Sequence, residues 1–384
     1  MENKTVKNII VVDDDRSIRV VMTTALTRAG YNVKSSGTAA GMWRIVESDF
    51  ADVLITDVGL PDGDALDILP KLQKNNPNLK IIVMSARTTL LTAVRAEKKG
   101  AFEYLPKPFD LDELLNLVSS TFFTPKIDKN VDLKNLTKNI YDSGPVVGKS
   151  MAMQEIYKII SRIVNTNHNI LISGESGTGK YLISKSIHDL SSKTNNLFIN
   201  LDVKFFENYS IDGLIDKIND YTSSNVNSIN ELSGSSIYIK DVTELSNIQQ
   251  KNLLNFIENG LPQLFQENSY LDKTRIFFST KKNILNYVEK GLFREDLYYR
   301  INIVPIKLPS LKDRFEDIPD LTLAFLEKNN QSKSINRSIS FECMNFLKEY
   351  SWPGNVRELK NVIDRLCLLS STEDIPLNLV KEVL

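Results

Sequence analysis

The chain has 384 residues, enough for two to three domains of roughly 150 residues each, so one site cannot account for all of it. Lys and Arg number 47 against 48 Asp and Glu, and residues 1–120 carry 15 basic and 16 acidic side chains. No segment has the basic excess that is typical of nucleic-acid binding. A hydrophobic fraction of 42% supports folded cores. No run of about 18 apolar residues predicts a membrane span.

The N-terminus and the cysteine content favour a cytoplasmic protein. The opening residues MENKTVKN lack the apolar stretch of a secretory signal. Cys343 and Cys367 are too few for a disulfide framework or a cysteine metal site, and both lie in apolar helical patterns where we expect core residues. The two histidines, His168 and His188, are not expected to be catalytic.

Short β-branched runs alternate with helical patterns over the first part of the chain. The runs lie at 8–12, 31–34, 52–56, 80–85 and 101–105. Five such units in a row predict a small parallel sheet covered on both faces by helices, in a domain spanning 1–122. Residues 123–144 lose the alternation and gather Pro, Asn and Lys, which predicts a linker with a candidate short helix at 131–136.

A second α/β pattern occupies residues 145–308. Its strand candidates lie at 169–173, 197–201, 236–239, 275–280 and 303–306. After Pro309 we expect no further strands, and three helical stretches predict a helical subdomain over 309–384. They lie near 317–329, 340–350 and 355–370. The Ser- and Asn-rich stretch 219–235 predicts a loop.

Five polar side chains follow strands of the first predicted sheet. Asp13 and Asp14 end the first strand, Asp57 the third and Ser85 the fourth, while Lys107 follows the fifth. The carboxyl ends of parallel strands form a ligand crevice, so we expect these side chains to converge. A Mg²⁺ ion would relieve the repulsion among the carboxylates and leave Asp57 as a nucleophile for a phosphoryl group, whose oxygens Lys107 and Ser85 would hold. The alternative is that the Asp residues only cap the following helices.

These residues resemble the receiver domain of two-component response regulators. VVDDDRSIR, ITDVGLPDGDAL, VMSA and KGAFEYLPKPFD match its pattern along most of residues 1–122. The resemblance implies a flavodoxin-like fold and phosphorylation of Asp57 by a sensor histidine kinase. It also implies that Mg²⁺ is held by Asp13, Asp14, Asp57 and the carbonyl of Gly59.

The resemblance further assigns two features beside the phosphorylation site. Ser85 and Tyr104 would form the switch pair of the domain. Lys107–Pro108 would be a cis peptide, in line with the rule that cis bonds belong mostly to proline.

A glycine-rich motif, GESGTGK at 174–180, lies between a predicted strand and a helical run. Gly174, Gly177 and Gly179 let backbone N–H groups turn inward, and Lys180 with the helix N-terminus adds positive potential, so the segment predicts a phosphate-binding loop for ATP. The remaining positions of the loop are Glu175, Ser176 and Thr178. The next position, usually Ser or Thr for a magnesium ion, is Tyr181, which weakens a metal site here.

From 146 to the end the chain resembles the AAA+ ATPases of bacterial enhancer-binding proteins of the NtrC type, with a helical lid. Members act on RNA polymerase carrying sigma-54 and self-associate through this domain. FREDLYYRINI matches the segment that offers Arg294 and Arg300 to a neighbouring subunit's ATP, and WPGNVREL assigns the sensor arginine to Arg357. The γ-phosphate sensor would be Thr280 or Asn283. The alternative for each arginine is a surface ion pair with a nearby acid.

The strand that should end in Asp-Glu in this family departs from the pattern. In SIYIKDVTEL, Lys240 falls on the first acid and Asp241 on the second, and sliding the register by one puts Val242 where the Glu should be. One acid is missing in either register, and a lysine at 240 would repel Mg²⁺. We therefore expect ATP binding with slow or absent hydrolysis.

Two further departures concern output. No GAFTGA sequence, the family's sigma-54 contact loop, lies between 200 and 236, where 207–219 is a candidate helix. This absence argues against a sigma-54 contact. The chain also stops at Leu384, where the family continues into a DNA-binding helix-turn-helix, so no direct DNA or membrane binding is expected.

Three interpretations remain open. The first is a phosphorylation-controlled regulator with a hydrolysis-impaired AAA+ domain that acts through protein partners or competes with an intact relative. The second is a working ATP-driven activator with a non-standard contact loop. The third is a phosphate sink for a histidine kinase.

Overall fold

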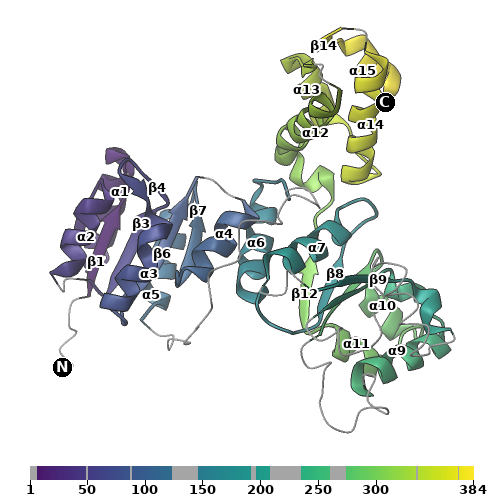
Figure 1. Ribbon diagram of the computed structural model, residues 1–384, viewed down its shortest axis with the longest axis horizontal. Helices are drawn as coiled ribbons and strands as arrows, with labels where there is room; N and C mark the ends of the chain where they lie inside the picture. Colours follow the sequence, from purple (N-terminus) through teal and green to yellow (C-terminus); the bar gives the residue numbers. More distant parts are fainter. Residues whose placement is uncertain are drawn as a thin grey trace. The chain divides into compact units, whose positions relative to one another are not determined.

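The computed structural model describes residues 7–48, 51–86, 89–122, 146–191, 196–207, 235–259, 274–333, 336–370 and 372–384. The chain divides into two compact units, a first unit Met1–Leu136 and a second unit Thr137–Leu384 (Figure 1). The predicted linker at 123–144 with its candidate helix, the candidate helix at 207–219 and the loop predicted at 219–235 lie outside the described residues, apart from their edges. The domain limits proposed from the sequence stay predictions.

The first unit is built on a five-stranded parallel sheet with the order β2-β1-β3-β6-β7. Its strands are β1 (Asn8–Val12), β2 (Asn32–Ser36), β3 (Val53–Asp57), β6 (Lys80–Ser85) and β7 (Glu103–Pro106). This order is the flavodoxin-like one, so the predicted fold is confirmed. A small antiparallel pair, β4 (Gly59–Leu60) and β5 (Gly63–Asp64), follows β3 and was not expected from the sequence.

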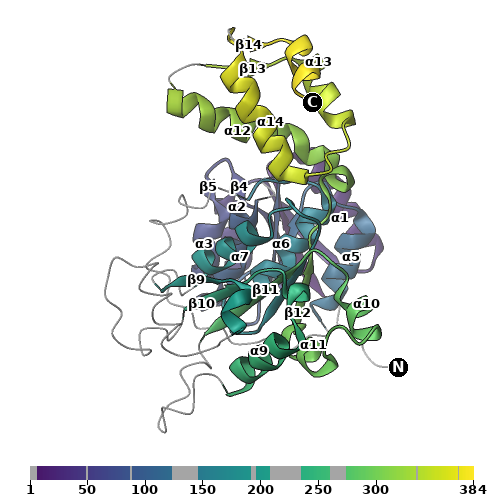
Figure 2. The same cartoon turned by 90° about the vertical axis from the view of Figure 1, so that its right-hand side faces the viewer.

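Helices cover both faces of this sheet. They are α1 (Arg16–Arg28), α2 (Ala39–Glu47), α3 (Ala65–Asn75), α4 (Leu90–Lys98) and α5 (Leu111–Ser120). Side chains of α1 and α5, such as Met22 and Leu114, share one buried cluster with Ile9 and Ile55 of the strands. Figure 2 places α1 and α5 on one side of the sheet and α2 and α3 on the other. Asp15 caps α1 by accepting from the N–H of Ser17, so Asp15 is the acid that caps the helix after β1.

The second unit contains another five-stranded parallel sheet, with the order β12-β8-β11-β10-β9. Its strands are β8 (Ile170–Ser173), β9 (Phe198–Leu201), β10 (Ser236–Ile239), β11 (Arg275–Thr280) and β12 (Val304–Lys307). The helices are α6 (Met151–Ile163), α7 (Lys180–Leu190), α9 (Asn247–Asn259), α10 (Ile284–Glu289) and α11 (Glu295–Ile301), with short turns η1 (Val203–Phe206) and η3 (Val242–Glu244). Leu253 of α9 and Leu297 of α11 pack in one cluster with Ile237 and Phe278 of the sheet, so these helices cover one face.

A helical subdomain completes the second unit. It comprises η6 (Leu311–Asp317), α12 (Ile318–Lys333), α13 (Phe341–Glu349), α14 (Asn355–Leu369) and α15 (Leu377–Val383). The expectation that strands stop after Pro309 is wrong in one detail, because β13 (Ser338–Ile339) pairs in parallel with β14 (Asp374–Ile375). Strands of two residues are too short to leave a periodic pattern. Cys343 and Cys367 lie in the core of this subdomain, as predicted.

Among the described residues, every helix is too short or too polar to cross a bilayer.

His188, in α7, forms hydrogen bonds at the beginnings of two neighbouring strands of the second sheet, β9 and β10. The ring is 1% exposed, with Nδ1 2.8 Å from the Ser236 hydroxyl oxygen and Nε2 3.0 Å from the Asn196 carbonyl oxygen. A carbonyl only accepts, so Nε2 donates to it and Nδ1 accepts from the hydroxyl. Burial, followed by the charge of Lys185, lowers the pKa of His188 from 6.5 to about 4. The ring is therefore neutral in the folded protein near neutral pH.

Acid should weaken the second unit through this histidine. The unfolded chain, with a His188 pKa of 6.5, binds a proton more readily than the folded chain with a pKa of about 4. Stability is therefore present above pH 6.5 and is lost as the pH falls toward 4, by up to about 3 kcal/mol. His188→Gln should flatten that slope. The measurement is urea unfolding followed by Trp352 fluorescence in a Trp43→Phe background, and equal slopes for the two proteins would refute the effect.

Candidate functional site

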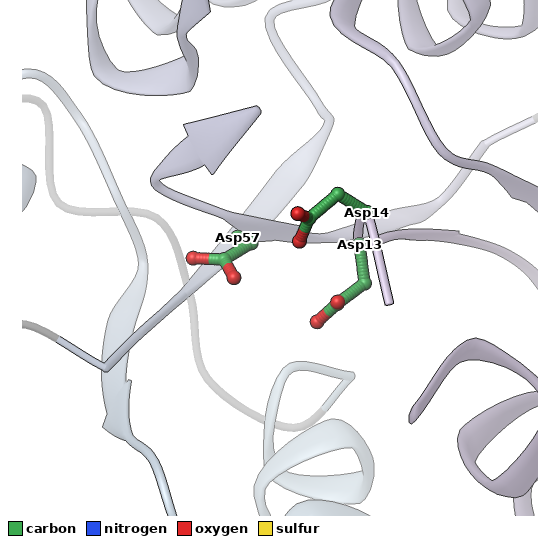
Figure 3. Close-up of side chains that lie close together, drawn as sticks. All are labelled: Asp13, Asp14 and Asp57. Carbon is green, nitrogen blue, oxygen red and sulfur yellow. The ribbon is translucent and has the colours of Figure 1, made fainter. Parts of the chain in front are cut away.

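Three carboxylates gather at the carboxyl edge of the first sheet (Figure 3). Asp13 and Asp14 follow β1, Asp57 ends β3, and one oxygen from each lies within 4.8 Å of the others. Asp13 is buried, Asp14 is exposed and Asp57 is intermediate. Figure 3 shows the Asp14 carboxylate directed toward Asp57. Carboxylate oxygens at this spacing fit a hard divalent cation such as Mg²⁺.

Lys107 binds two of these acids. Its ammonium lies 2.6 Å from Asp13 Oδ2 and also contacts Asp57 Oδ2. Burial lowers the pKa of Lys107, but its hydrogen bonds to Asp13 and Asp57 outweigh burial, so the net pKa is raised. One lysine against three acids leaves net negative charge at the sheet edge. The arrangement can hold a cation, and a nucleophilic oxygen of Asp57 would then lie beside that cation and the Lys107 ammonium.

The remaining predicted residues of the first unit lie around this cluster. Tyr104 is buried, and its hydroxyl shares a hydrogen bond with the side chain of Ser85. Burial raises the pKa of Tyr104 to about 12. The Gly59 N–H donates to Asp57 Oδ1 at 3.4 Å. The Lys107–Pro108 peptide is cis, as predicted from the resemblance.

The glycine-rich segment forms a loop between β8 and α7. Gly174, Gly177 and Gly179 have φ of +153°, +81° and +104°, a region that side chains other than glycine's adopt rarely. The ammonium of Lys180 donates to the carbonyls of Gly174 and Glu175, both at 2.7 Å. Burial lowers the pKa of Lys180. The lysine therefore lies across the loop, where phosphate oxygens would replace the two carbonyls.

The lid contacts this loop through Asn355, a residue that the sequence reasoning missed. Asn355 is buried with φ of +54°, and its side chain accepts from the N–H of Leu311 at 2.6 Å. Its Nδ2 donates to Glu175 Oε2 and to the Ser176 carbonyl, both at 3.0 Å. The signal in the sequence was an Asn directly after a Trp-Pro-Gly turn, since Asn tolerates the left-handed region.

Arg357, the predicted sensor arginine, lies two residues further along α14. Its Nη1 donates to the Ser176 hydroxyl at 3.3 Å, and its N–H donates to the Gly177 carbonyl at 3.3 Å. A Cβ on Gly177 would overlap the carbonyl oxygen of Gly354, so only glycine permits this approach. Arg357 therefore lies at the loop, away from the ion pair with Glu358 that was the alternative.

Two more buried polar residues connect the helical subdomain to the rest of the second unit, and neither was singled out from the sequence. The Arg314 guanidinium donates to the Thr178 carbonyl at 3.0 Å. Asp317 accepts from the N–H groups of Lys149 and Ser150 at 2.7 and 2.8 Å, and from the Ser150 hydroxyl at 2.8 Å. Both lie in the segment LPSLKDRFEDIP at 308–319.

The two residues at the acid positions after β10 lie in different surroundings. The strand ends at Ile239, Lys240 is exposed, and Asp241 adopts φ +52° and ψ +52° with its N–H donating to the Ser279 hydroxyl at 3.2 Å. Lys281, after β11, lies 2.5 Å from Glu244 Oε1 and 3.9 Å from Asp241 Oδ2. A lysine thus occupies the neighbourhood of the acids that would hold a metal ion.

Both candidates for the γ-phosphate sensor lie just after β11. Thr280 is buried, with its hydroxyl 3.2 Å from that of Thr243 and 3.1 Å from the N–H of Lys282, which donates to it. Asn283 caps α10 by accepting from the N–H of Leu285 at 3.1 Å. The Thr280 side chain thus bonds to its neighbours at the end of β11, whereas the Asn283 side chain bonds to the first turn of α10.

The two arginines predicted to serve a neighbouring subunit lie at the ends of α11. Both are exposed. Arg294 pairs with Asp296 at 3.0 and 2.6 Å, the surface ion pair that was the alternative interpretation. The Arg300 carbonyl accepts from Asn169 at 3.1 Å.

Family models match the described architecture along the chain. Residues 9–119 match a response regulator receiver domain, 146–307 a sigma-54 interaction domain, and 312–384 an AAA+ ATPase lid domain. Together with the two sheets and their loops, these matches define a two-component response regulator that couples a receiver to an AAA+ sigma-54 interaction domain.

Relatives that match along the whole chain narrow this class. The DNA-binding transcriptional regulator NtrC of Rhizobium meliloti (strain 1021) is 35% identical over 98% of this chain and 78% of its own length. NtrC of Azospirillum brasilense is 37% identical over 97% and 78%. The crystal structure of NtrX from Brucella abortus in complex with ATP has a TM-score of 0.51 at 27% identity, over 98% of this chain and 84% of that one. The chain belongs to the NtrC family of response regulators.

The contact of Asn355 with the phosphate loop can be tested with an isosteric change. Asn355→Asp keeps the acceptor for Leu311 but places a carboxylate against Glu175 and the Ser176 carbonyl, so we expect a loss of about 2 kcal/mol in unfolding free energy. Urea unfolding followed by Trp352 fluorescence measures it, again with Trp43→Phe.

Adding Glu175→Gln should recover about half of the loss, because the amide can donate to the new carboxylate. Glu175→Gln alone, which keeps an acceptor for Asn355, is the control. A double variant as unstable as Asn355→Asp would exclude the contact.

Proposed function

We propose that Asp57 is the phosphoryl acceptor of the first unit and that a sensor histidine kinase is its donor. In this step an Asp57 carboxylate oxygen forms a bond to phosphorus as the bond to the kinase histidine nitrogen breaks, and that nitrogen keeps the electron pair. A bound Mg²⁺ would supply charge neutralisation, held by Asp13, Asp14, Asp57 and the Gly59 carbonyl. The observation that carries the proposal is the three-carboxylate cluster at the sheet edge with Lys107 on it.

Lys107 and Ser85 would then hold the oxygens of the phosphorylated side chain. Lys107 already contacts the Asp57 carboxylate, and its raised pKa keeps the ammonium charged. Ser85 shares a hydrogen bond with Tyr104, so a phosphoryl oxygen that draws the Ser85 hydroxyl would change the surroundings of Tyr104. We propose this pair as the route by which phosphorylation alters the first unit.

For the second unit we propose ATP binding with slow hydrolysis. The phosphate loop, Lys180 and Arg357 support binding, as does the similarity to an NtrX structure solved with ATP. Lys240 in place of an acid, and Asp241 in a left-handed turn, argue against efficient activation of water. Arg294 and Arg300, exposed on α11, are proposed to reach ATP in a neighbouring copy. The even charge balance of the chain favours protein partners over nucleic acid for these domains.

Phosphorylation is tested with acetyl phosphate, a small-molecule phosphodonor, and a phosphate-affinity gel. We expect the wild-type chain to be modified with Mg²⁺ present and not in EDTA, because the carboxylates repel the incoming phosphoryl group without a cation. Asp57→Asn should abolish modification, since the amide is not nucleophilic. Asp67→Asn, which removes an exposed acid that pairs with Lys99, is the control. Equal modification of Asp57→Asn and wild type would overturn the assignment.

Hydrolysis is tested with radiolabelled ATP, with and without acetyl phosphate. We expect turnover well below about one per second, the slow end of ordinary enzymes. Lys240→Asp with Asp241→Glu should raise turnover at least tenfold, roughly the effect of restoring one positioned catalytic group. Lys180→Ala, which removes the loop lysine, is the control, because any turnover it retains measures contaminating ATPase activity.

The assay separates the other interpretations as well. Fast wild-type turnover would favour a working activator, and no ATP binding at all would favour a phosphate sink. A double variant with unchanged turnover would contradict our account of the impaired hydrolysis.

A further inference from the structure

Four positive side chains surround the phosphate loop of the second unit. Lys180 begins α7, Arg357 reaches Ser176 from the lid, and Lys240 and Lys281 follow β10 and β11. Besides burial, the charges of Arg357, Lys281 and Lys240 lower the pKa of Lys180, and the Asp241 charge opposes them. These three cations are therefore close enough to Lys180 to act on its charge. The four positive side chains outnumber Asp241 and Glu244, the acids that follow β10 at this edge.

The residues that should hold Mg²⁺ beside ATP do not fit that ion. Tyr181, at the usual Ser or Thr position, packs its ring edge-on against Phe198 and Tyr238, with centroids 5.7 and 5.3 Å apart. A phenol held in such a ring cluster does not supply the short hydroxyl ligand of the motif. Lys240 is a cation at the first acid position.

The acids that remain after β10 already have a cation. The Lys281 ammonium lies 2.5 Å from Glu244 and 3.9 Å from Asp241, and these contacts raise its pKa, the hydrogen bond to Glu244 most. The ammonium is a compact point charge on a flexible stem. Lys281 thus supplies, from within the chain, positive charge beside the acids where the family binds a metal ion.

Lys281 also lines a cleft next to the phosphate loop. The cleft has a volume of about 590 Å³ and is bordered by Glu175 and Ser176 of the loop and by Lys281 and Lys312. Its other lining residues are Ser310, Ser351, Trp352 and Pro353. Its volume falls within the usual range of ligand pockets. The Lys281 side chain therefore faces the same space as the phosphate loop.

We propose that the second unit binds ATP without a divalent cation, with the Lys281 ammonium in place of the metal at the terminal phosphates. This rests on the proposed ATP binding. Free ATP carries about four negative charges, and Lys180, Lys240, Lys281 and Arg357 provide four positive charges near the loop once Lys281 leaves Glu244. Magnesium–ATP would bring a further dication among these cations. Releasing Glu244 costs little, because the side chains of this ion pair are 39% and 42% exposed and water screens their attraction.

The test is titration of a fluorescent N-methylanthraniloyl ATP into the full-length protein, in excess EDTA and in excess Mg²⁺. We expect affinity in EDTA at least as high as in Mg²⁺. Lys281→Gln should weaken binding in EDTA about tenfold, the loss of one charge-assisted hydrogen bond. Lys282→Gln, which removes the same charge from a neighbour placed over Tyr287, should bind like the wild type.

A second variant tests whether nucleotide binding can be made to depend on Mg²⁺. Tyr181→Thr with Lys240→Asp supplies a hydroxyl and a carboxylate, the ligands that Mg²⁺ prefers, so Mg²⁺ should now raise affinity about tenfold. Tyr181 is 48% exposed and Lys240 is exposed, so both changes should be tolerated.

The outcomes separate this inference from the proposed function. Wild-type binding that requires Mg²⁺, or Lys281→Gln binding as well as Lys282→Gln, would overturn the inference and leave ATP binding intact. Absence of nucleotide binding in both EDTA and Mg²⁺ would overturn ATP binding and the inference together.

Discussion

Both sites depend on parallel strand pairing, which brings the carboxyl ends of distant strands to one edge. In the first unit Asp57 pairs in register with Met84, and Val12 pairs with Thr56, so residues that directly follow β1 and β3 meet. In the second unit Thr280 pairs with Ser173, where the phosphate loop begins. Residues separated by about a hundred positions of sequence become neighbours because the parallel register brings their strand ends to the same edge of the sheet.

The same geometry carries opposite charge in the two units. At the first edge three carboxylates face the ammonium of Lys107, and the excess negative charge suits a divalent cation. At the second edge Lys180, Lys281 and Arg357 lie around the loop, and the excess positive charge suits phosphate oxygens directly. The same strand geometry thus supports the metal site that we propose in one unit and the anion site that we propose in the other, and the side chains at the strand ends make the difference.

Strand-end residues were predictable because their positions follow from local patterns. The alternation of apolar runs located every strand of the two large sheets to within about two residues, and the sheet rule then gathered Asp13, Asp57 and Lys107. Asn355, Arg314 and Asp317 were missed because the partners of their hydrogen bonds lie more than a hundred residues away in the sequence. The turn before Asn355 indicates its backbone conformation but not these partners. The β13–β14 pair was missed for another reason, since two residues carry no period. The roles of the site residues stay predictions.

The missed residues matter because they join the lid to the phosphate loop by buried polar contacts. Arg314 holds the Thr178 carbonyl and Asn355 holds Glu175 and Ser176, so a displacement of the loop would break hydrogen bonds that water cannot readily replace. These hydrogen bonds therefore link the position of the loop to that of the lid. The departures from the family pattern are at Tyr181 and Lys240, two positions that relate to metal binding and water activation. They do not involve the hydrogen bonds between the lid and the loop. A domain altered in that way keeps the parts needed to bind a nucleotide and respond to it, which is the combination that the proposed function requires.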